Sequence, residues 1–89
     1  MGKKREFKAR VTVYPRPEIL DPQGKAIGDA LRRLGFSQVR EVRAGKSFDI
    51  VLEGTSTKKV KEQLEQMCSR LLANPLIEDY TFELAGESS

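Results

Sequence analysis

The sequence predicts an α+β fold of the ferredoxin-like type, with the element order βαββαβ and both helices on one face of a four-stranded antiparallel sheet. Two observations predict it. Apolar and polar residues alternate in several segments, as in half-buried strands, and two other segments repeat apolar residues at spacings of three, four and seven, as in amphipathic helices. The 89 residues suffice for one domain. We place it at 6–85, between a basic disordered tail at 1–5 and a polar tail at 86–89.

The strands are expected where apolar alternation is bounded by turn residues. The first alternates from Phe7 to Val13 and ends at Pro15, which cannot donate a hydrogen bond to a sheet. The second lacks clean alternation, which is typical of a bulged or edge strand. A turn at 44–47 separates it from the third. The four expected strands span residues 6–15, 38–43, 48–53 and 77–84.

The first helix is expected over residues 22–34. Asp21 can accept a hydrogen bond from an unpaired N–H group at the helix start, a proline follows at the first helical position, and Gly35 suits the left-handed residue after the helix end. Inside the helix, Gly24 and Gly28 each cost about 1 kcal/mol relative to alanine, which indicates close approach of another backbone. That backbone could belong to the domain's own sheet or to a partner chain.

The second helix is expected to begin after Ser56 or Thr57 and to end before Asn74, because a following proline disfavours the helical region. Its wide apolar face includes Met67 and Cys68. A cysteine in this place could be a nucleophile or a small core residue. The chain has no histidine to activate it, so we favour the core for both side chains.

Charge and composition exclude several classes of protein. Lys and Arg number 16 against 13 Asp and Glu, and the three surplus charges lie in the tail at Lys3, Lys4 and Arg5. Nucleic-acid binding rests on clustered, uncompensated positive charge, which the balanced remainder lacks. No apolar run is long enough to span a membrane and the start has no secretory signal. We therefore expect a cytoplasmic protein with no membrane partner.

The sheet face opposite the helices is expected to neutralise its own charges. Lys8 and Arg10 of the central first strand would lie between acidic residues of the neighbouring strands, such as Asp49 and Glu83. The RNA recognition motif shares this fold but stacks bases on aromatic residues of its central strands, and here only Tyr14 offers one. We therefore expect no nucleic-acid partner.

Candidate chemistry is sparse. Lys25, Arg43 and Lys46 could bind an anion near the turn, but charged turn residues are usually just solvated and the sequence has no phosphate-loop pattern. An acylphosphatase-like hydrolase needs an anion-cradling loop after the first strand, and here two prolines surround Arg16. A metallochaperone needs a Cys-x-x-Cys pair, which is missing. We expect no catalytic residue, and no metal or cofactor bound by this chain.

Three runs of residues are specific enough to indicate a family. They are Leu-Asp-Pro-Gln-Gly at 20–24, Val-Arg-Glu-Val-Arg-Ala-Gly-Lys at 39–46, and Leu-Ala-Asn-Pro at 72–75 followed by Ile-Glu-Asp-Tyr at 77–80. With flanking residues they extend over about 11–83, nearly the whole domain. Together they resemble the small, PurS-type subunit of bacterial and archaeal phosphoribosylformylglycinamidine synthase. Ala44 departs mildly from that family, in which a larger apolar residue is usual at this place.

The resemblance implies a role in purine biosynthesis. In that family a glutaminase subunit releases ammonia from glutamine. A large synthetase subunit then uses ATP and Mg²⁺ to convert formylglycinamide ribonucleotide (FGAR) into its amidine (FGAM). The small subunit is a homodimer or higher homo-oligomer that bridges the two enzymes and assists ammonia transfer without catalytic residues of its own. Both enzymes are therefore the implied partners.

Two interaction surfaces follow as hypotheses. Self-association would use the open sheet face, and a partner subunit would contact the start of the first helix and the turn before the third strand. The first surface comprises Lys8, Arg10, Thr12, Tyr14 and Val51, and the second comprises Asp21, Pro22, Gln23, Gly24, Lys25, Arg43, Gly45 and Lys46. The alternative is a ligand-sensing module similar to amino-acid-binding ACT domains, which pair through their sheets and bind ligands at the seam.

Overall fold

The structure is a computed structural model that describes residues 3–87, with side chains as far as Leu84. Residues 1–2 and 88–89 of the two expected tails lie outside the described residues. The first and last strands both extend into the expected tails, to Arg5 and to Glu87. In chain order the elements are β1 (Arg5–Pro15), α1 (Pro22–Arg33), β2 (Lys46–Gly54), α2 (Thr57–Met67), a π-helical turn η1 (Cys68–Leu72) and β3 (Glu78–Glu87).

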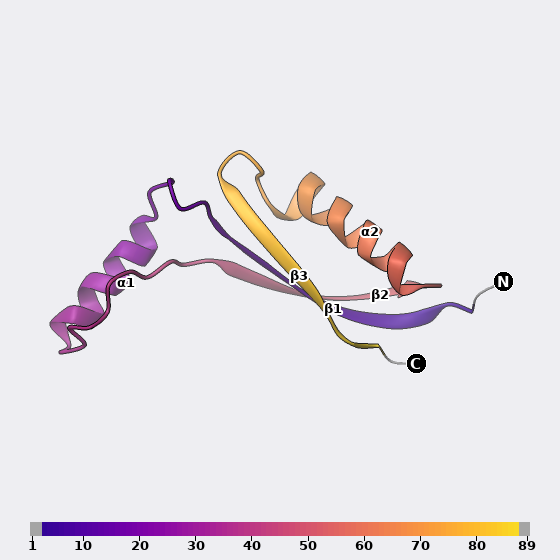
Figure 1. The fold of residues 1–89 in the computed structure, drawn as a ribbon, viewed down its shortest axis with the longest axis horizontal. Coiled ribbons are helices and arrows are strands. Elements are labelled where there is room, and N and C mark those ends of the chain that lie inside the picture. The colour runs from indigo at the N-terminus through magenta and orange to yellow at the C-terminus, as the bar shows by residue number, and fades with distance from the viewer. Residues whose placement is uncertain (1–2, 88–89) are drawn as a thin grey trace.

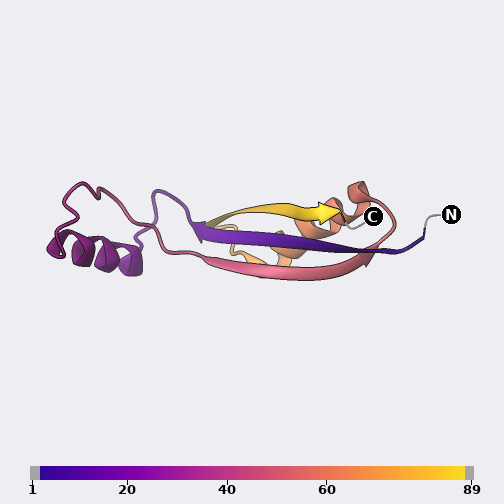
Figure 2. The ribbon, with the colours of Figure 1, turned by 90° about the horizontal axis from the view of Figure 1, so that it is seen from below.

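The sheet has three antiparallel strands in the order β2-β1-β3, so β1 lies in the centre (Figure 1; Figure 2). The α+β class is confirmed, but the predicted four-stranded sheet is wrong. Residues 38–43, expected to form the second strand, form no strand and pair with none of the three described strands.

Local contacts with α1 explain why residues 38–43 are not a strand. The segment runs beyond the end of the sheet, ahead of β2, instead of folding back along the free edge of β2 (Figure 1). The Arg32 guanidinium donates to the Val39 carbonyl at 3.0 Å, and the Ala44 N–H donates to the Asp21 carboxylate at 2.8 Å. These contacts exist only once α1 has formed, so the segment's own apolar pattern could not reveal them.

Both helices begin where the sequence predicts. Asp21 caps α1 by accepting from the Gly24 N–H at 3.0 Å, and Ser56 caps α2 by accepting from the Lys59 N–H at 3.2 Å. Gly35 has a φ of 105° just after α1, as its predicted position requires. Within the described range, neither helix has the length and apolar character needed to cross a membrane.

The hydrophobic core lies between β1 and the second helical segment. The inward side chains of β1 pack against α2 and η1. The buried residues are Phe7, Ala9, Val11 and Val13 of β1, Val60 and Leu64 of α2, and Cys68 of η1. The core position predicted for Cys68 is confirmed, and burial raises the pKa of its thiol. Met67 is only half-buried at the edge of this core. The Tyr80 hydroxyl donates to the Glu65 carboxylate and joins β3 to α2.

The prediction that both helices cover one sheet face is wrong for α1. α2 lies across the sheet, whereas α1 projects past its end and makes at most marginal contacts with the other described helices and strands (Figure 1; Figure 2). The molecule therefore measures 58 × 27 × 14 Å, and its radius of gyration is 17.1 Å, against about 12 Å for a compact chain of this length. We call residues 20–45 the arm, and the three strands with α2 and η1 the body.

Candidate functional site

The Asp21 carboxylate links the two halves of the arm. Asp21 accepts from the Gly24 N–H at the start of α1, at 3.0 Å. It also accepts, at 2.8 Å, from the Ala44 N–H on the segment that leads from α1 back to β2 (residues 36–45), which we call the returning segment. These backbone donors, helped by the nearby Arg43 charge, lower the pKa of Asp21. A single side chain thus caps the helix and clamps it to the strand-like segment beneath.

Gly24, and not Gly28, allows that segment to approach α1 closely. A Cβ atom added at Gly24 would lie 2.3 Å from the Val42 carbonyl oxygen, whereas one at Gly28 would lie 3.5 Å or more from its neighbours, which include the Val42 side chain. The close backbone that the sequence predicted therefore belongs neither to the chain's own sheet nor to a partner. It belongs to the returning half of the arm.

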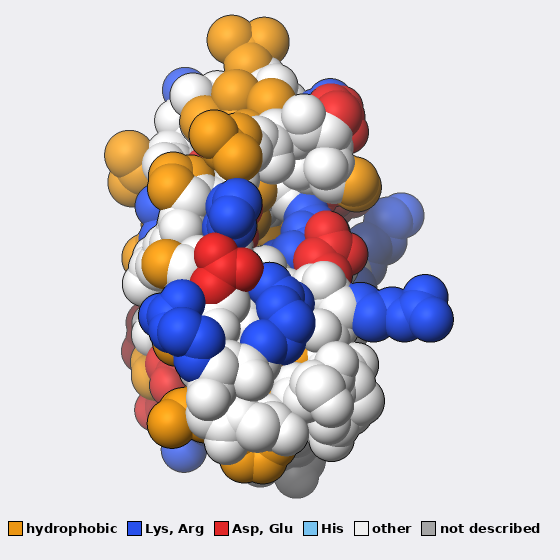
Figure 3. All heavy atoms as spheres, turned by 90° about the vertical axis from the view of Figure 1, so that its left-hand side faces the viewer, with side chains coloured by type: hydrophobic (Ala, Val, Ile, Leu, Met, Phe, Trp, Pro, Cys, Tyr) orange, Lys and Arg blue, Asp and Glu red, His pale blue; other side chains and the backbone are white. Residues whose placement is uncertain are grey.

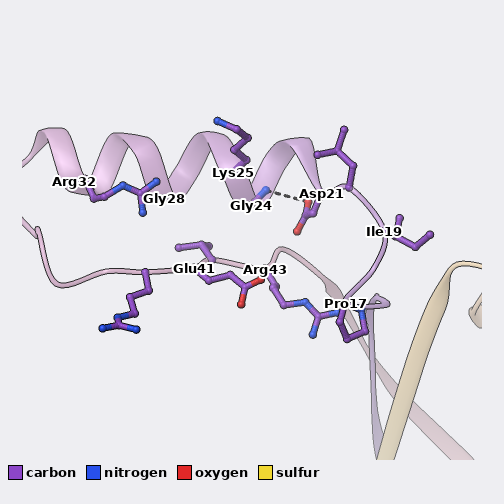
Figure 4. A pocket seen from close by; sticks show the side chains of 12 residues that line it. Pro17, Ile19, Asp21, Gly24, Lys25, Gly28, Arg32, Glu41 and Arg43 are labelled. Carbon is purple, nitrogen blue, oxygen red and sulfur yellow. Dashed lines mark hydrogen bonds between the residues drawn. The ribbon is translucent and has the colours of Figure 1, made fainter.

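The junction, which we define as residues 20–25 and 43–46, brings together most of the predicted partner-contact residues. Asp21, Gly24, Lys25 and Arg43 line one hollow of about 260 Å³ between α1 and the returning segment (Figure 4). Gln23, Gly45 and Lys46 line a second hollow of about 210 Å³ beside the end of β1. Pro22 lies between these groups as the first residue of α1.

The returning segment passes tightly against β1 where it enters β2. A Cβ atom at Gly45 would lie 2.4 Å from the Val13 carbonyl oxygen, so this approach requires glycine. The Arg43 guanidinium lies 5.2 Å from the centre of the Tyr14 ring, within cation–π range. This contact, which the sequence analysis missed, makes the junction continuous with the open face of the sheet.

The third family-like run also lies at this end of the sheet. Asn74 and Glu78 build the loop before β3, because the Asn74 N–H donates to the Glu78 carboxylate at 2.7 Å and the Asn74 amide accepts from the Leu76 N–H at 3.1 Å. Arg16 ties the loop to the end of β1, since its N–H donates to the Ile77 carbonyl at 2.9 Å. Glu78 also lines the smaller junction hollow. All three sequence runs thus converge where the arm leaves the body.

The three cations considered for an anion site do not gather in one place. Arg43 and Lys46 line a shared hollow with Tyr14, whereas Arg43 and Lys25 line a different one. Lys25 points away from the returning segment (Figure 4) and pairs with Asp29 at 3.1 Å. The arrangement favours a contact surface over an anion pocket.

The open sheet face has the predicted charge pairing at Arg10, whereas Lys8 lies opposite Val51. Arg10 lies opposite Asp49 on one side and Glu83 on the other, and its guanidinium donates twice to Asp49, at 2.8 and 3.3 Å. This hydrogen-bonded pair raises the pKa of Arg10 and lowers that of Asp49. Beside them Val51 is 63% exposed, and it lines a shallow hollow with Lys8 and Arg10. Thr12 and Tyr14 continue the same face toward the junction.

Comparisons with known proteins agree on one family. Residues 8–86 match the family model described as PurS, phosphoribosylformylglycinamidine (FGAM) synthase. The chain is 45% identical over 78 residues to the phosphoribosylformylglycinamidine synthase subunit PurS of Methanocaldococcus jannaschii, which covers 88% of this chain and 94% of that protein.

Solved structures agree as well. The crystal structure of M. jannaschii PurS, one of the subunits of formylglycinamide ribonucleotide amidotransferase in the purine biosynthetic pathway, superposes with a TM-score of 0.80 at 40% identity, covering 92% of this chain and 99% of that one. A chain in the structure of PurLQS from Thermotoga maritima superposes with a TM-score of 0.84 at 31% identity, covering 91% and 99%.

Proposed function

The chain belongs to the PurS family of FGAM synthase subunits, which act in purine biosynthesis, and we propose that within that complex it bridges the catalytic subunits. The observation that carries this proposal is the likeness over nearly the whole chain to a subunit of a PurLQS assembly. The ACT-like alternative is not favoured, since every relative reported above is a PurS protein.

In this proposal the chain positions the two enzymes relative to each other and carries out no reaction itself. A glutaminase subunit releases ammonia, and a large synthetase subunit uses ATP and Mg²⁺ to turn FGAR into FGAM. The bridge fixes the two active sites relative to each other, so that ammonia passes between them without escaping. Two features support a scaffold role. Cys68, the one thiol, is buried with a raised pKa, and Arg10 and Asp49 of the open face are already paired with each other.

We assign the partner-subunit contact to the junction. Its residues come from two distant parts of the sequence and meet at one end of the sheet, where Arg43 and Lys46 offer exposed cations. The self-association proposed from the sequence uses the open face around Arg10 and Val51. We place the assembly in the cytoplasm, where purine precursors are made, and assign no cofactor to this subunit.

The test is affinity capture from native lysate with a tagged chain. Recovery of a glutaminase and an ATP-dependent synthetase is the expected result, and recovery of neither would refute the bridging role. Arg43→Glu and Lys46→Glu should each reduce recovery of at least one partner. Lys58→Glu, an exposed cation on α2 far from the junction, is the matched control and should recover both.

A further inference from the structure

Two positive charges at the junction have no ionic partner within the described chain. The carboxylates near them are already engaged, since Asp21 accepts from two backbone N–H groups and Asp79 lies 3.6 Å from the Arg16 guanidinium. Among the described side chains, by contrast, neither Arg43 nor Lys46 forms an ion pair. The junction therefore carries two cations that remain free to bind an anionic group.

These two cations border one hollow at the junction end of the open sheet face. Its volume is about 360 Å³. The residues that line it are Thr12, Tyr14, Arg43, Gly45, Lys46 and Ser47. None of the six is acidic, and three of them carry hydroxyl groups. Thr12 and Ser47 lie directly opposite each other on β1 and β2, so their side chains share this face of the sheet. The hollow thus combines two positive charges with neutral hydrogen-bond donors, a set of groups that suits a carboxylate.

The backbone that carries the two cations is held in place. The Ala44 N–H donates to Asp21 at 2.8 Å, and at Gly45 the chain passes so close to β1 that a Cβ atom would lie 2.4 Å from a carbonyl oxygen there. The Arg43 side chain extends toward the segment that follows β1 (Figure 4), and its guanidinium lies 5.2 Å from the centre of the Tyr14 ring. Groups that are positioned before binding lose less conformational entropy when a partner docks.

Nucleic acid and free phosphate fit the hollow less well than a carboxylate does. The Arg43 guanidinium already lies over the Tyr14 ring, so this ring face is not open for the stacking of a base. A phosphate is commonly held by N–H groups at a helix start, but here the Gly24 N–H donates to Asp21. A guanidinium and an ammonium remain as charged donors, and the planar guanidinium matches the geometry of a carboxylate.

We propose that this hollow receives an aspartate or glutamate side chain from a catalytic subunit of the complex. Arg43 and Lys46 pair with the carboxylate, and the hydroxyl groups of Thr12 and Ser47 supply further donors. Lys and Arg side chains also gather across the middle of the surface at the arm end of the molecule (Figure 3), which steers an acidic segment toward the junction. This inference rests on the bridging role proposed above and names the chemistry of its contact.

Carbodiimide cross-linking of the chain assembled with its glutaminase and synthetase subunits tests the contact. The reagent activates a carboxylate, and a lysine amine that touches it attacks the activated carbonyl and displaces the reagent as a urea, which leaves an amide bond between the two side chains. We expect mass spectrometry to find Lys46 joined to an Asp or Glu of a catalytic subunit. Lys58, an exposed lysine on α2, is the matched control, and the yield at Lys46 should be about tenfold higher or more.

Substitutions of Lys46 separate its charge from its reactivity. Lys46→Arg keeps the positive charge but cannot form the amide, so it should assemble with a dissociation constant within about twofold of the unaltered chain and give no link at this position. Lys46→Glu should raise the dissociation constant about tenfold or more, because it places like charges together. Replacing the linked carboxylate of the partner by lysine should then restore binding to Lys46→Glu.

The proposal is overturned if the complex assembles and the yield at Lys46 does not exceed that at Lys58, or if the exchange of charges fails to restore binding. The bridging role stands in both cases, because the complex has formed. Failure of the unaltered chain to assemble with either enzyme would refute the bridging role and this inference with it.

Discussion

The body and the arm of this protein are stabilised by different interactions. The body has a buried apolar cluster centred on β1 and α2, with Phe7, Val11 and Leu64 almost fully inaccessible to water. In the arm, only the two helix glycines of α1 are buried, and its halves are held by the Asp21 carboxylate, the Arg32 guanidinium and the close backbone approach at Gly24. The body is therefore stabilised by a buried apolar core, whereas the arm is shaped by local contacts and leaves apolar side chains such as Ile27 and Leu34 exposed.

The largest expected effect comes from the body. Leu64→Ala should lower the free energy of unfolding by about 2–5 kcal/mol, because it leaves a cavity in the buried cluster. Chemical denaturation at a fixed protein concentration measures it, and Leu76→Ala at an exposed loop position should stay within about 0.5 kcal/mol. Equal losses for the two variants would contradict the assignment of the core.

A matched glycine pair separates the arm from the body. Gly24→Ala should destabilise the arm by about 1–3 kcal/mol, since its Cβ would meet the Val42 carbonyl at 2.3 Å. Gly28→Ala should be neutral or stabilising by up to about 1 kcal/mol, because that position has room and alanine favours a helix. Hydrogen exchange at the amides of residues 22–33 reports the difference. The account fails if Gly24→Ala protects these amides as well as Gly28→Ala does.

Acid should loosen the arm. Backbone donors lower the pKa of Asp21, so its contribution to the fold is complete above the ordinary carboxyl value near 4 and is lost as the pH falls through the lowered value. NMR of the Gly24 and Ala44 amides should follow this titration. Asn is a comparable helix cap that does not titrate, so Asp21→Asn should remove the acid response of both amides. An unchanged response in that variant would argue against the clamp.

The smallest expected effect lies in the body at high pH. The hydrogen bond to Glu65 raises the pKa of Tyr80 to about 12, so this contact stabilises the fold below the ordinary tyrosine value near 10 and is lost as the pH rises toward about 12. Phenolate absorbance in Tyr14→Phe, which leaves Tyr80 as the one tyrosine, measures the value. Adding Glu65→Gln to this variant should return the pKa of Tyr80 toward 10. A phenolate midpoint near 10 in the Tyr14→Phe variant that keeps Glu65 would contradict the Tyr80–Glu65 hydrogen bond.

Much of the body could be predicted from the sequence, because its elements depend on periodicity and local caps. The alternation around β1, the cap at Ser56 and the burial of Cys68 are confirmed. Residues 38–43 and α1 were placed wrongly, since contacts with Asp21 and Arg32, and not apolar pattern, decide their position. The roles of Asp21 and Gly24 could be predicted because a helix cap and an unfavourable glycine inside a helix both leave local signals in the sequence. The Arg43–Tyr14 contact and the Arg16 anchor join residues far apart in sequence and left none.

Hydrogen exchange of the free chain and of the chain assembled with its glutaminase and synthetase subunits tests the central claim most directly. In the free protein, β1 amides should exchange far more slowly than those of the arm. On assembly, the account predicts that the largest gain in protection falls on the junction, at residues 20–25 and 43–46, with α2 amides unchanged. Gained protection confined to α2, with the junction exchanging as in the free chain, would contradict it.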